Sequence, residues 1–298
     1  MVKHECLDAM LRPMLRPMLP GMLRRGLCTA SRPTTHFGYR TVDEADKERL
    51  VGNVFDSVAS NYDVMNDLMS AGVHRAWKDS FVRMLGVSAQ SSANLQMLDI
   101  AGGTGDIAFR IADELAAHPV SSHSANADER ARVVVSDINK QMLDEGQRRA
   151  EKLSPSRTGG WPKMEWIVAD AMKLPFEDES FDVYTIAFGI RNVTRIPDAL
   201  AEAHRVLRPG GRFMCLEFSQ VNNPMLREAY KQYSFNVIPK IGGLVANDAA
   251  SYQYLVESIQ KFPDQESFAG LIREAGFRHV SHTSLTGGIV AIHSGIKS

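Results

Sequence analysis

The chain has 298 residues, of which 44% are hydrophobic and 23% are charged, and its formal net charge at pH 7 is −1. This composition is typical of a globular protein and excludes a disordered chain, a collagen-like chain and a disulfide scaffold. No apolar run approaches the roughly 18 residues that would predict a membrane-spanning helix. The nearly balanced charge also argues against a general nucleic-acid-binding protein.

The charge is unevenly distributed along the chain. Residues 1–42 hold six Arg and one Lys against two acidic residues, so this segment carries +5 and residues 43–298 carry −6. An Arg-rich leader that has no acidic residue from position 9 to 42 is typical of a mitochondrial transit peptide, whereas a secretory signal needs an apolar run that Arg interrupts here. Residues 1–35 are therefore predicted to be a transit peptide. A disordered basic arm is the alternative, because three prolines in 13–20 disfavour a helix.

The body of the chain predicts alternating strands and helices. Residues 43–86 are expected to be helical, and residues 219–262 are expected to cover one end of the sheet as a helical lid. A β-hairpin around Gly287 and Gly288 closes the chain. The expected strands are 96–100, 132–137, 164–170, 181–188 and 212–218, and the expected helices between and after them are 106–117, 139–153, 197–207 and 265–277. This alternation predicts βαβ units and a parallel sheet.

The three cysteines predict neither a disulfide nor a metal site. Cys6 and Cys28 lie in the leader, which leaves Cys215 alone in the body, and no Cys/His spacing suits a metal.

A glycine-rich loop follows the first buried strand, in the run from Asp99 to Gly105. Small residues let the backbone approach a ligand closely, and the helix that follows offers unpaired N–H groups. The pattern from Gly103 through Gly105 to Ala108 also satisfies the dinucleotide motif, so an NAD-dependent oxidoreductase is one alternative. Asp99 weighs against it, because a carboxylate beside a pyrophosphate is unfavourable, whereas it suits an ammonium or sulfonium ion.

Two further acids end the next two strands. Asp137 is placed to accept hydrogen bonds from both hydroxyls of a ribose, and Asp170 to accept from an adenine amino group while Ala171 donates its backbone N–H. Each acid taken singly could be a turn residue or a helix cap. Together these features make the chain resemble the class I S-adenosylmethionine-dependent methyltransferases over about residues 96–218. Ala101 departs from the glycine that many members have there.

That resemblance implies a Rossmann-like α/β fold with a seven-stranded, mostly parallel sheet whose last strand is antiparallel. It also implies S-adenosyl-L-methionine as the co-substrate, bound by residues of the three strand ends. The implied binding residues are Asp99, Gly103, Thr104, Gly105, Asp137, Asp170 and Ala171.

A narrower resemblance extends over residues 50–298. The chain is similar to the ubiquinone/menaquinone-biosynthesis C-methyltransferases in the stretches FDSVASNYDVMNDLMSAGVHRAWK, LDIAGGTGDIAFRI, FGIRNVTRIPDALAEAHRVLRPGGRFMCLEFS and DAASYQYLVESIQKFPDQE. The resemblance implies methylation of a ring carbon of 2-methoxy-6-polyprenyl-1,4-benzoquinol. It also implies one methyltransferase domain over 43–298, with a helical cap at 43–90 and a helical acceptor-side insertion at 219–262.

Three residues are candidates for catalysis or for positioning the acceptor. A phenolate is a better carbon nucleophile than a phenol, so a group that stabilises the ionised hydroxyl is needed. Arg191 and Asn192 follow the fourth strand, and a guanidinium stabilises a phenolate or orients a water. Tyr62 lies in the segment expected to fold over the co-substrate. Alternatives are a surface ion pair for Arg191 and, for Tyr62, a packed aromatic ring whose hydroxyl is satisfied.

Other polar residues carry weaker predictions. Glu217 ends the fifth strand and is expected to cap a helix more readily than to act as a base. His74 and His204 are expected to be packed or at the surface. Asp63 and Asp67 are equally compatible with holding the N-terminal segment and with helix capping.

The prenyl tail of the implied acceptor requires an apolar groove, for which residues 219–262 supply aromatic and aliphatic side chains, although the same residues would serve as core. The resemblance implies a matrix-side, peripheral location on the mitochondrial inner membrane and assembly with other ubiquinone-biosynthesis proteins. Two rival hypotheses remain besides the oxidoreductase: a class I methyltransferase with another acceptor, and a non-catalytic scaffold within a biosynthetic complex.

Overall fold

A computed structural model of the chain describes residues 33–58, 66–67, 70, 72–87, 94–117, 131–153, 161–237, 239–240 and 248–298. One compact unit extends from Pro33 to Ser298. Most of the predicted leader therefore lies outside the described residues, and its last three predicted positions, 33–35, belong to this unit.

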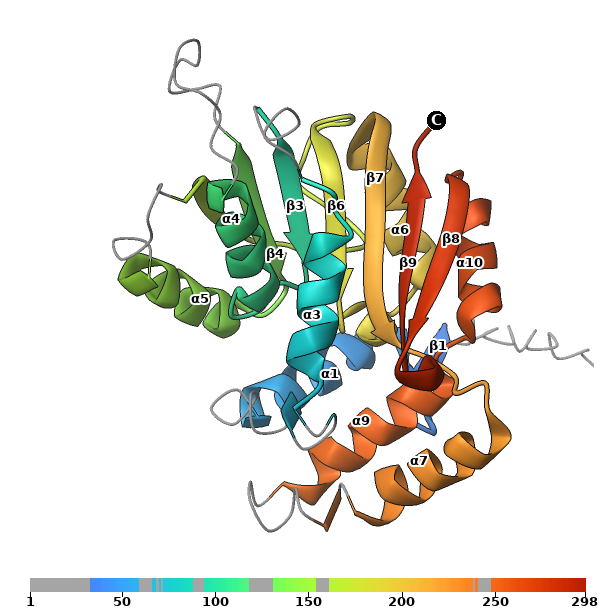
Figure 1. The fold of residues 1–298 in the computed structure, drawn as a ribbon. Helices are drawn as coiled ribbons and strands as arrows, with labels where there is room; N and C mark the ends of the chain where they lie inside the picture. Colours follow the sequence, from blue (N-terminus) through green and yellow to red (C-terminus); the bar gives the residue numbers. More distant parts are fainter. Residues whose placement is uncertain are drawn as a thin grey trace, which may run out of the picture. The chain divides into compact units, whose positions relative to one another are not determined.

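The unit is built on a seven-stranded sheet (Figure 1). The strands in spatial order are β5 (Lys163–Val168), β4 (Arg132–Asp137), β3 (Gln96–Ile100), β6 (Phe181–Ala187), β7 (Leu207–Phe218), β9 (Val290–Ile296) and β8 (Arg278–Leu285). The neighbours from β5 to β7 are parallel, and β9 runs antiparallel to both β7 and β8. The predicted α/β fold with an antiparallel last strand and a closing hairpin is confirmed.

Helices cover both faces of the sheet, which explains why its central strands are apolar runs without alternation. One face carries α3 (His74–Arg83), α4 (Asp106–Ala117) and α5 (Lys140–Leu153), and the other carries α6 (Ile196–Val206) and α10 (Gln265–Glu274) (Figure 1). Each face of the sheet has its own hydrophobic core. In β4, Val133 and Val135 pack in the core on the side of α3 and α4, whereas Val134 packs in the core on the side of α6 and α10. All three side chains are buried. Packing in the two cores holds the strands in place, and the loops that follow the strands are positioned with them.

A further group of elements lies at the carboxyl ends of the parallel strands (Figure 1). It contains the hairpin β1 (Thr34–Phe37) and β2 (Arg40–Asp43), followed by α1 (Glu44–Val58), α7 (Pro224–Asn236) and α9 (Ala249–Lys261). The side chains of Asn223 and Asp248 cap α7 and α9 by accepting backbone N–H groups. The hairpin differs from the sequence prediction, which placed residues 34–35 in the leader and gave residues 36–43 no strand.

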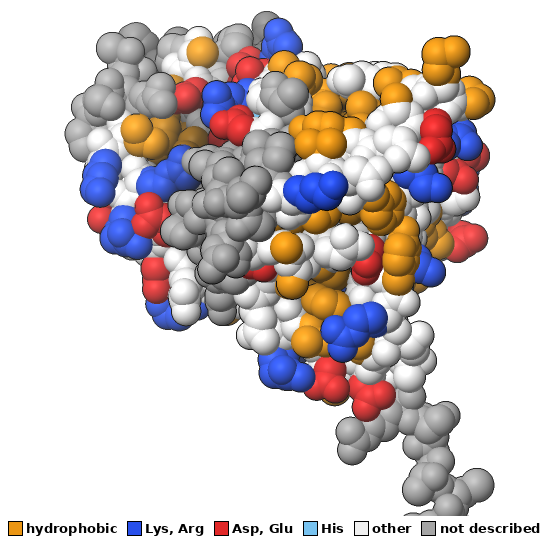
Figure 2. Space-filling view, turned by 90° about the horizontal axis from the view of Figure 1, so that it is seen from below, with side chains coloured by type: hydrophobic (Ala, Val, Ile, Leu, Met, Phe, Trp, Pro, Cys, Tyr) orange, Lys and Arg blue, Asp and Glu red, His pale blue; other side chains and the backbone are white. Residues whose placement is uncertain are grey.

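No helix in the described part of the chain is both long enough and apolar enough to cross a membrane. Figure 2 views the carboxyl-end side, where hydrophobic side chains gather toward the right half of the view.

Candidate active site

The main pocket lies where the loops after β3, β4, β5 and β6 meet α1, and it encloses about 890 Å³ of space that is partly open to solvent. Parallel strands direct their carboxyl ends to the same edge, which is where α/β sheets bind ligands. The main pocket is lined by Glu48, Val51, Gly52, Phe55, Ile100, Ala101, Gly103, Asp137, Ile138, Asn139, Met142, Ala169, Asp170, Ala171, Met172, Phe188, Gly189, Asn192, Val193 and Thr194.

The glycine-rich loop after β3 is shaped by close packing. A Cβ on Gly102 would meet Val135 Cγ1 at 2.5 Å, so a side chain there would displace the loop. Gly103 has φ +52° and lines the main pocket. Gly105 has φ +86°, and a Cβ there would meet Trp166 at 2.7 Å, so this glycine permits packing of the following helix rather than lining the main pocket.

Asp99 is the most unusual acid of the site. Its side chain is 1% exposed, its Oδ1 accepts a hydrogen bond of 2.7 Å from Thr185 Oγ1, and its Oδ2 has no partner. Burial raises the pKa of this carboxyl to about 7. An unpartnered buried carboxylate oxygen needs a cation or a donor from a ligand.

A smaller hollow is lined by Asp99 and also by a lysine. Asp99, Thr104 and Lys78 all line it, and it shares Gly103 and Phe188 with the main pocket. The Nζ of Lys78 donates to Asp106 Oδ2 at 2.6 Å, which ties α3 to the start of α4. The hollow is therefore lined by two carboxylates, those of Asp99 and Asp106, and by one ammonium that is paired with Asp106. Lys78 was not predicted from sequence, because this contact joins separate helices.

The other two strand-end acids organise the backbone as well as lining the main pocket. Asp137 Oδ2 accepts from Gly103 N at 3.0 Å and Oδ1 accepts from Asn139 N at 2.8 Å. Asp170 Oδ1 accepts from Met172 N at 2.9 Å. Asp137 and Asp170 therefore both act as turn residues, as the alternative interpretation predicted. Their carboxylate oxygens still have lone pairs that can accept hydrogen bonds from ligand hydroxyls or amines.

A second cavity, here called the side pocket, adjoins these residues; it is narrow, with room for about one water molecule. It is lined by Val54, Phe55, Asn66, Phe188, Arg191, Asn192, Phe218, Ser251, Tyr254 and Leu255. Phe55, Phe188 and Asn192 line both the main pocket and the side pocket, so the two cavities meet at these three residues.

Arg191 is buried in the wall of the side pocket, at 6% exposure. Its Nη1 donates to Glu217 Oε1 at 2.8 Å and to Phe188 O at 2.6 Å. Glu217 also accepts backbone N–H groups of Arg191 and Phe218. Arg191 therefore forms an ion pair, but a buried one, so the predicted surface ion pair is wrong. Glu217 braces the short η4 helix (Ile190–Asn192) that carries both candidates. Burial raises the pKa of Glu217, while the Arg191 charge opposes that shift.

Asn192 has a fixed orientation. The hydroxyl of Tyr254 on α9 donates to Asn192 Oδ1 at 2.9 Å, and Asn192 Nδ2 is buried without a partner. Both N–H groups of this amide are thus left for another acceptor. Tyr254 was missed from sequence because it lies 62 positions away.

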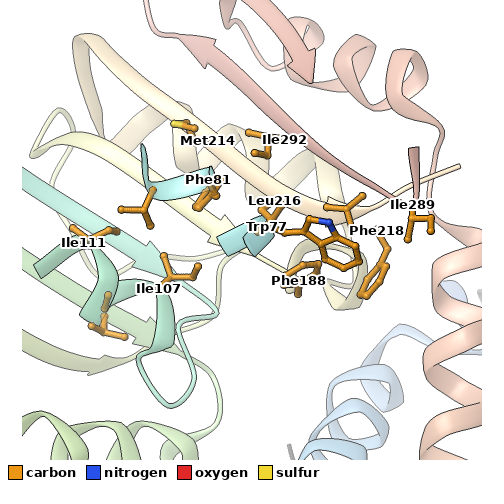
Figure 3. Packing of buried hydrophobic residues seen from close by; sticks show 14 of the residues in the cluster. Trp77, Phe81, Ile107, Ile111, Phe188, Met214, Leu216, Phe218, Ile289 and Ile292 are labelled. Atoms are coloured by element: carbon orange, nitrogen blue, oxygen red, sulfur yellow. The ribbon is translucent and has the colours of Figure 1, made fainter. Parts of the chain in front are cut away.

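Three aromatic rings support the junction between the two pockets (Figure 3). Trp77 packs against Phe188 and Phe218, with ring centroids 6.5 and 6.2 Å away, and the latter two rings are 5.0 Å apart. Phe188 has φ +56°, and Ala101 opposite has φ +52°. Such strain in residues with side chains concentrates at functional sites.

The comparisons with known proteins agree with this geometry. Residues 42–297 match the model of the ubiE/COQ5 methyltransferase family. The chain belongs to this family. A Dinoroseobacter shibae relative named ubiquinone/menaquinone biosynthesis C-methyltransferase UbiE is 57% identical, with 89% of this chain and 97% of the relative aligned. Relatives from Danio rerio and Homo sapiens, both named mitochondrial 2-methoxy-6-polyprenyl-1,4-benzoquinol methylase, are each 50% identical to this chain. The alignment with the Danio rerio protein covers 92% of this chain and 88% of the relative. The alignment with the Homo sapiens protein covers 88% of this chain and 84% of the relative.

Solved structures confirm the fold. A Thermotoga maritima S-adenosylmethionine-dependent methyltransferase, described as a possible histamine N-methyltransferase, superposes with a TM-score of 0.53 at 17% identity, over 83% of this chain and 99% of that one. At such low identity the similarity concerns the fold alone. Membership of the ubiE/COQ5 family makes the chain an S-adenosylmethionine-dependent methyltransferase and excludes the oxidoreductase alternative.

The residues present fit that co-substrate. The unpartnered Asp99 Oδ2 matches a positively charged ligand, and Gly103 lines the main pocket with backbone and no side chain. Asp137 and Asp170 with Ala171 lie in the same pocket, as expected for ribose and adenine contacts.

The remaining predicted residues are distributed as follows. Tyr62 and Asp63 lie outside the described residues. Asp67 pairs with His74 Nε2 at 2.9 Å and with Arg75 at 3.0 Å, which favours a role in holding the N-terminal segment. His204 packs edge-on against Phe277 with a centroid distance of 5.1 Å.

Proposed function

We propose that this chain transfers a methyl group from S-adenosylmethionine to a ring carbon of 2-methoxy-6-polyprenyl-1,4-benzoquinol, in ubiquinone biosynthesis. The names of the Danio rerio and Homo sapiens relatives support this substrate, and the meeting of the two pockets at Asn192 and Phe188 supports the reaction. A methyl donor in the main pocket would lie against these residues, and an acceptor ring would have to approach it at this junction.

When bound, S-adenosylmethionine supplies a methyl group already activated by its sulfonium. The protein then has to hold the charged donor, position the ring and stabilise the ionised hydroxyl. Asp99 offers its free Oδ2 to the positive end of the donor, and Lys78 lies in the same hollow to face its carboxylate. Asp137, with Asp170 and Ala171, orients the nucleoside.

Arg191 acts as a fixed positive charge rather than as a base. Its guanidinium is paired with Glu217 and offers positive charge that would stabilise a phenolate electrostatically. Both oxygens of Glu217 already accept hydrogen bonds, which assigns this carboxylate the role of positioning Arg191. Asn192 adds N–H donors at the junction of the pockets.

The proposal extends to the location of the enzyme. Relatives from animals are named mitochondrial, and the first 35 residues have the composition of a transit peptide. A substrate with a prenyl tail resides in a bilayer, so the enzyme is proposed to act at the matrix face of the inner membrane as a peripheral protein. It is proposed to dock there with other ubiquinone-biosynthesis proteins, because a body of −6 gives little electrostatic attraction to anionic lipid.

The quinone profile of cells that lack the protein tests this function. Mass spectrometry should show accumulation of the demethylated quinone intermediate, and the native gene should clear it. A strain carrying Asp137→Ala should accumulate the same intermediate, because the variant loses the nucleoside contact and leaves Gly103 N and Asn139 N without their acceptor. No accumulation in the deletion strain would refute the quinol assignment, and normal synthesis with Asp137→Ala would favour a scaffold.

A further inference from the structure

Arg149 on α5 is a cation without an acidic partner among the described residues. Its neighbour Arg148 pairs with Glu145, one turn away on the same helix. Arg149 forms no such ion pair within the described part of the chain, and its Nη1 donates instead to Thr104 Oγ1 at 3.0 Å. The charge of this guanidinium is therefore directed at the glycine-rich loop after β3, which lies 45 positions earlier in the chain.

This contact is held in place because α5 packs closely on the loop. A Cβ on Gly146, one turn before Arg149, would meet the carbonyl carbon of Thr104 at 3.0 Å. Residues three apart lie on the same face of a helix, so Arg149 faces the loop as well. Its guanidinium also lies over the ring of Phe109 on α4, 5.6 Å from the ring centroid. The arginine is thus held both by the loop and by the helix that follows it.

The hydrogen bond from Arg149 decides how the Thr104 hydroxyl can act. A guanidinium only donates hydrogen bonds, so Thr104 Oγ1 is the acceptor in this one. The O–H of Thr104 is left to donate elsewhere, and none of the described residues accepts it. Thr104 lines the smaller hollow, which shares Gly103 with the main pocket. Its hydroxyl is therefore available to an acceptor oxygen of a ligand that extends into the hollow.

The charges around the hollow show why an additional cation matters. Asp99 and Asp106 both line the hollow, and the ammonium of Lys78 is paired with Asp106 at 2.6 Å. The unpartnered Oδ2 of Asp99 suits the ammonium of an amino acid. A carboxylate that enters the same hollow meets two acids and one cation, which opposes its binding. Arg149, hydrogen-bonded to Thr104, supplies a second positive charge on this side of the loop.

We propose that Arg149 is a positioning residue for the carboxylate of S-adenosylmethionine. Arg149 lines neither of the two pockets nor the hollow, so it acts through Thr104 rather than by touching the co-substrate. It leaves the Thr104 O–H to donate to the carboxylate, and its charge offsets the repulsion from the two acids. The placement of the amino-acid end of the co-substrate in the hollow rests on the proposed function.

Two ligands separate this role from general support of the loop. S-adenosylhomocysteine carries the carboxylate and its decarboxylated form lacks only that group, so calorimetry with the full chain compares the two affinities. Arg149→Met should weaken binding of S-adenosylhomocysteine about tenfold and leave that of the decarboxylated ligand within about twofold. Arg149→Lys keeps a charged donor and should restore most of the loss. Arg148→Met, at the exposed neighbouring position, should change neither affinity.

A variant of the threonine tests the same contact from its other side. Thr104→Val keeps the shape of the side chain without its hydroxyl, so it should also weaken binding of S-adenosylhomocysteine. Arg149→Met should then cost less in the Thr104→Val background than in wild type, because the two residues act through one hydrogen bond. Unchanged affinity for S-adenosylhomocysteine in both single variants, an equal loss for both ligands, or no restoration by Arg149→Lys would overturn the proposal.

The outcome is separable from that of the proposed function. Unchanged ligand binding by Arg149→Met, in an enzyme whose deletion causes the demethylated quinone to accumulate, would remove the role of Arg149 and leave the function intact. A loss specific to the carboxylate, in an enzyme whose deletion leaves the quinones unchanged, would support the role of Arg149 and refute the quinol assignment.

Discussion

Asp99 combines complete burial with one unpartnered oxygen, and at the scale of single residues this makes it sensitive to both pH and ligand. Burial raises its pKa in the folded protein to about 7, well above the ordinary value of 3.8 for an aspartate. The folded state therefore binds more protons than the unfolded state between these values. The contribution of this residue to the free energy of unfolding is largest below about pH 4 and is lost as the pH rises to about 7.

A cationic ligand favours the ionised form of Asp99, so its binding is predicted to release a proton. At pH 6, S-adenosylmethionine should displace protons from the enzyme because its positive charge favours the ionised Asp99. Calorimetric titration in two buffers with different ionisation enthalpies measures the number released, which should shrink toward zero by pH 8. Asp99→Asn should abolish the release and weaken binding about tenfold or more. Equal release by wild type and Asp99→Asn would contradict the role assigned to this carboxylate.

At the scale of elements, the N-terminal hairpin and α1 hold the loop that follows β6. Lys47 is 1% exposed, and its Nζ donates to Val193 O at 3.0 Å. Arg195 pairs with Glu44 at 2.8 Å on the same loop. Val193 directly follows Asn192, so these contacts fix the residue at which the two pockets meet.

We expect Lys47→Met to remove a pH-dependent contribution to stability and also to lower the turnover rate. Burial lowers the pKa of Lys47 to about 8, with the nearby Glu44 opposing the shift and His36 as another titratable neighbour. Because the folded pKa is depressed, the unfolded state binds more protons between about pH 8 and 10.5, and the contribution of Lys47 to stability rises over that window. Urea unfolding should show this rise in wild type and its loss in the variant. The loosened loop should lower kcat about tenfold to a hundredfold.

The matched control is Arg49→Met on the same helix. Arg49 is exposed and pairs only with Asp46 among the contacts described for it, so its removal should leave kcat and the pH dependence of unfolding close to wild type. If Lys47→Met retained full turnover, the loop would not depend on this anchor.

The sequence predicted those elements whose signals are local. The central strands between Gln96 and Phe218 were identified because a strand buried on both faces is a short apolar run. Asp137 and Asp170 line the main pocket and Asp99 the adjoining hollow, while their roles as ligand contacts stay predictions. The hairpin at Thr34–Asp43 was missed because it is short and half exposed. Lys47 was missed because a buried lysine contradicts its usual preference for the surface. Tyr254 and Lys78 act through tertiary contacts that no sequence spacing reveals.

At the scale of the whole molecule, the folded unit begins inside the predicted leader, which makes the exact start of the mature chain important. Phe37 of the hairpin stacks on Tyr254 with ring centroids 4.1 Å apart, and Tyr39 N donates to Glu257 on the same helix. The hairpin thus supports the helix whose tyrosine orients Asn192.

Two truncations test how far the chain can be shortened. Residues 33–298 should methylate a short-tailed quinol at the rate of the full chain and unfold at the same temperature, because they contain the whole compact unit. Residues 44–298 keep α1 and the complete sheet but lose the ring that packs on Tyr254, so the protein should fold with a lower kcat and a lower melting temperature. Phe37→Ala in the 33–298 protein should reproduce much of that loss, since it removes the same stacking contact, whereas Thr41→Ala, at an exposed position of the same hairpin, should not. Full activity of the 44–298 protein would show that Asn192 is oriented without help from the hairpin.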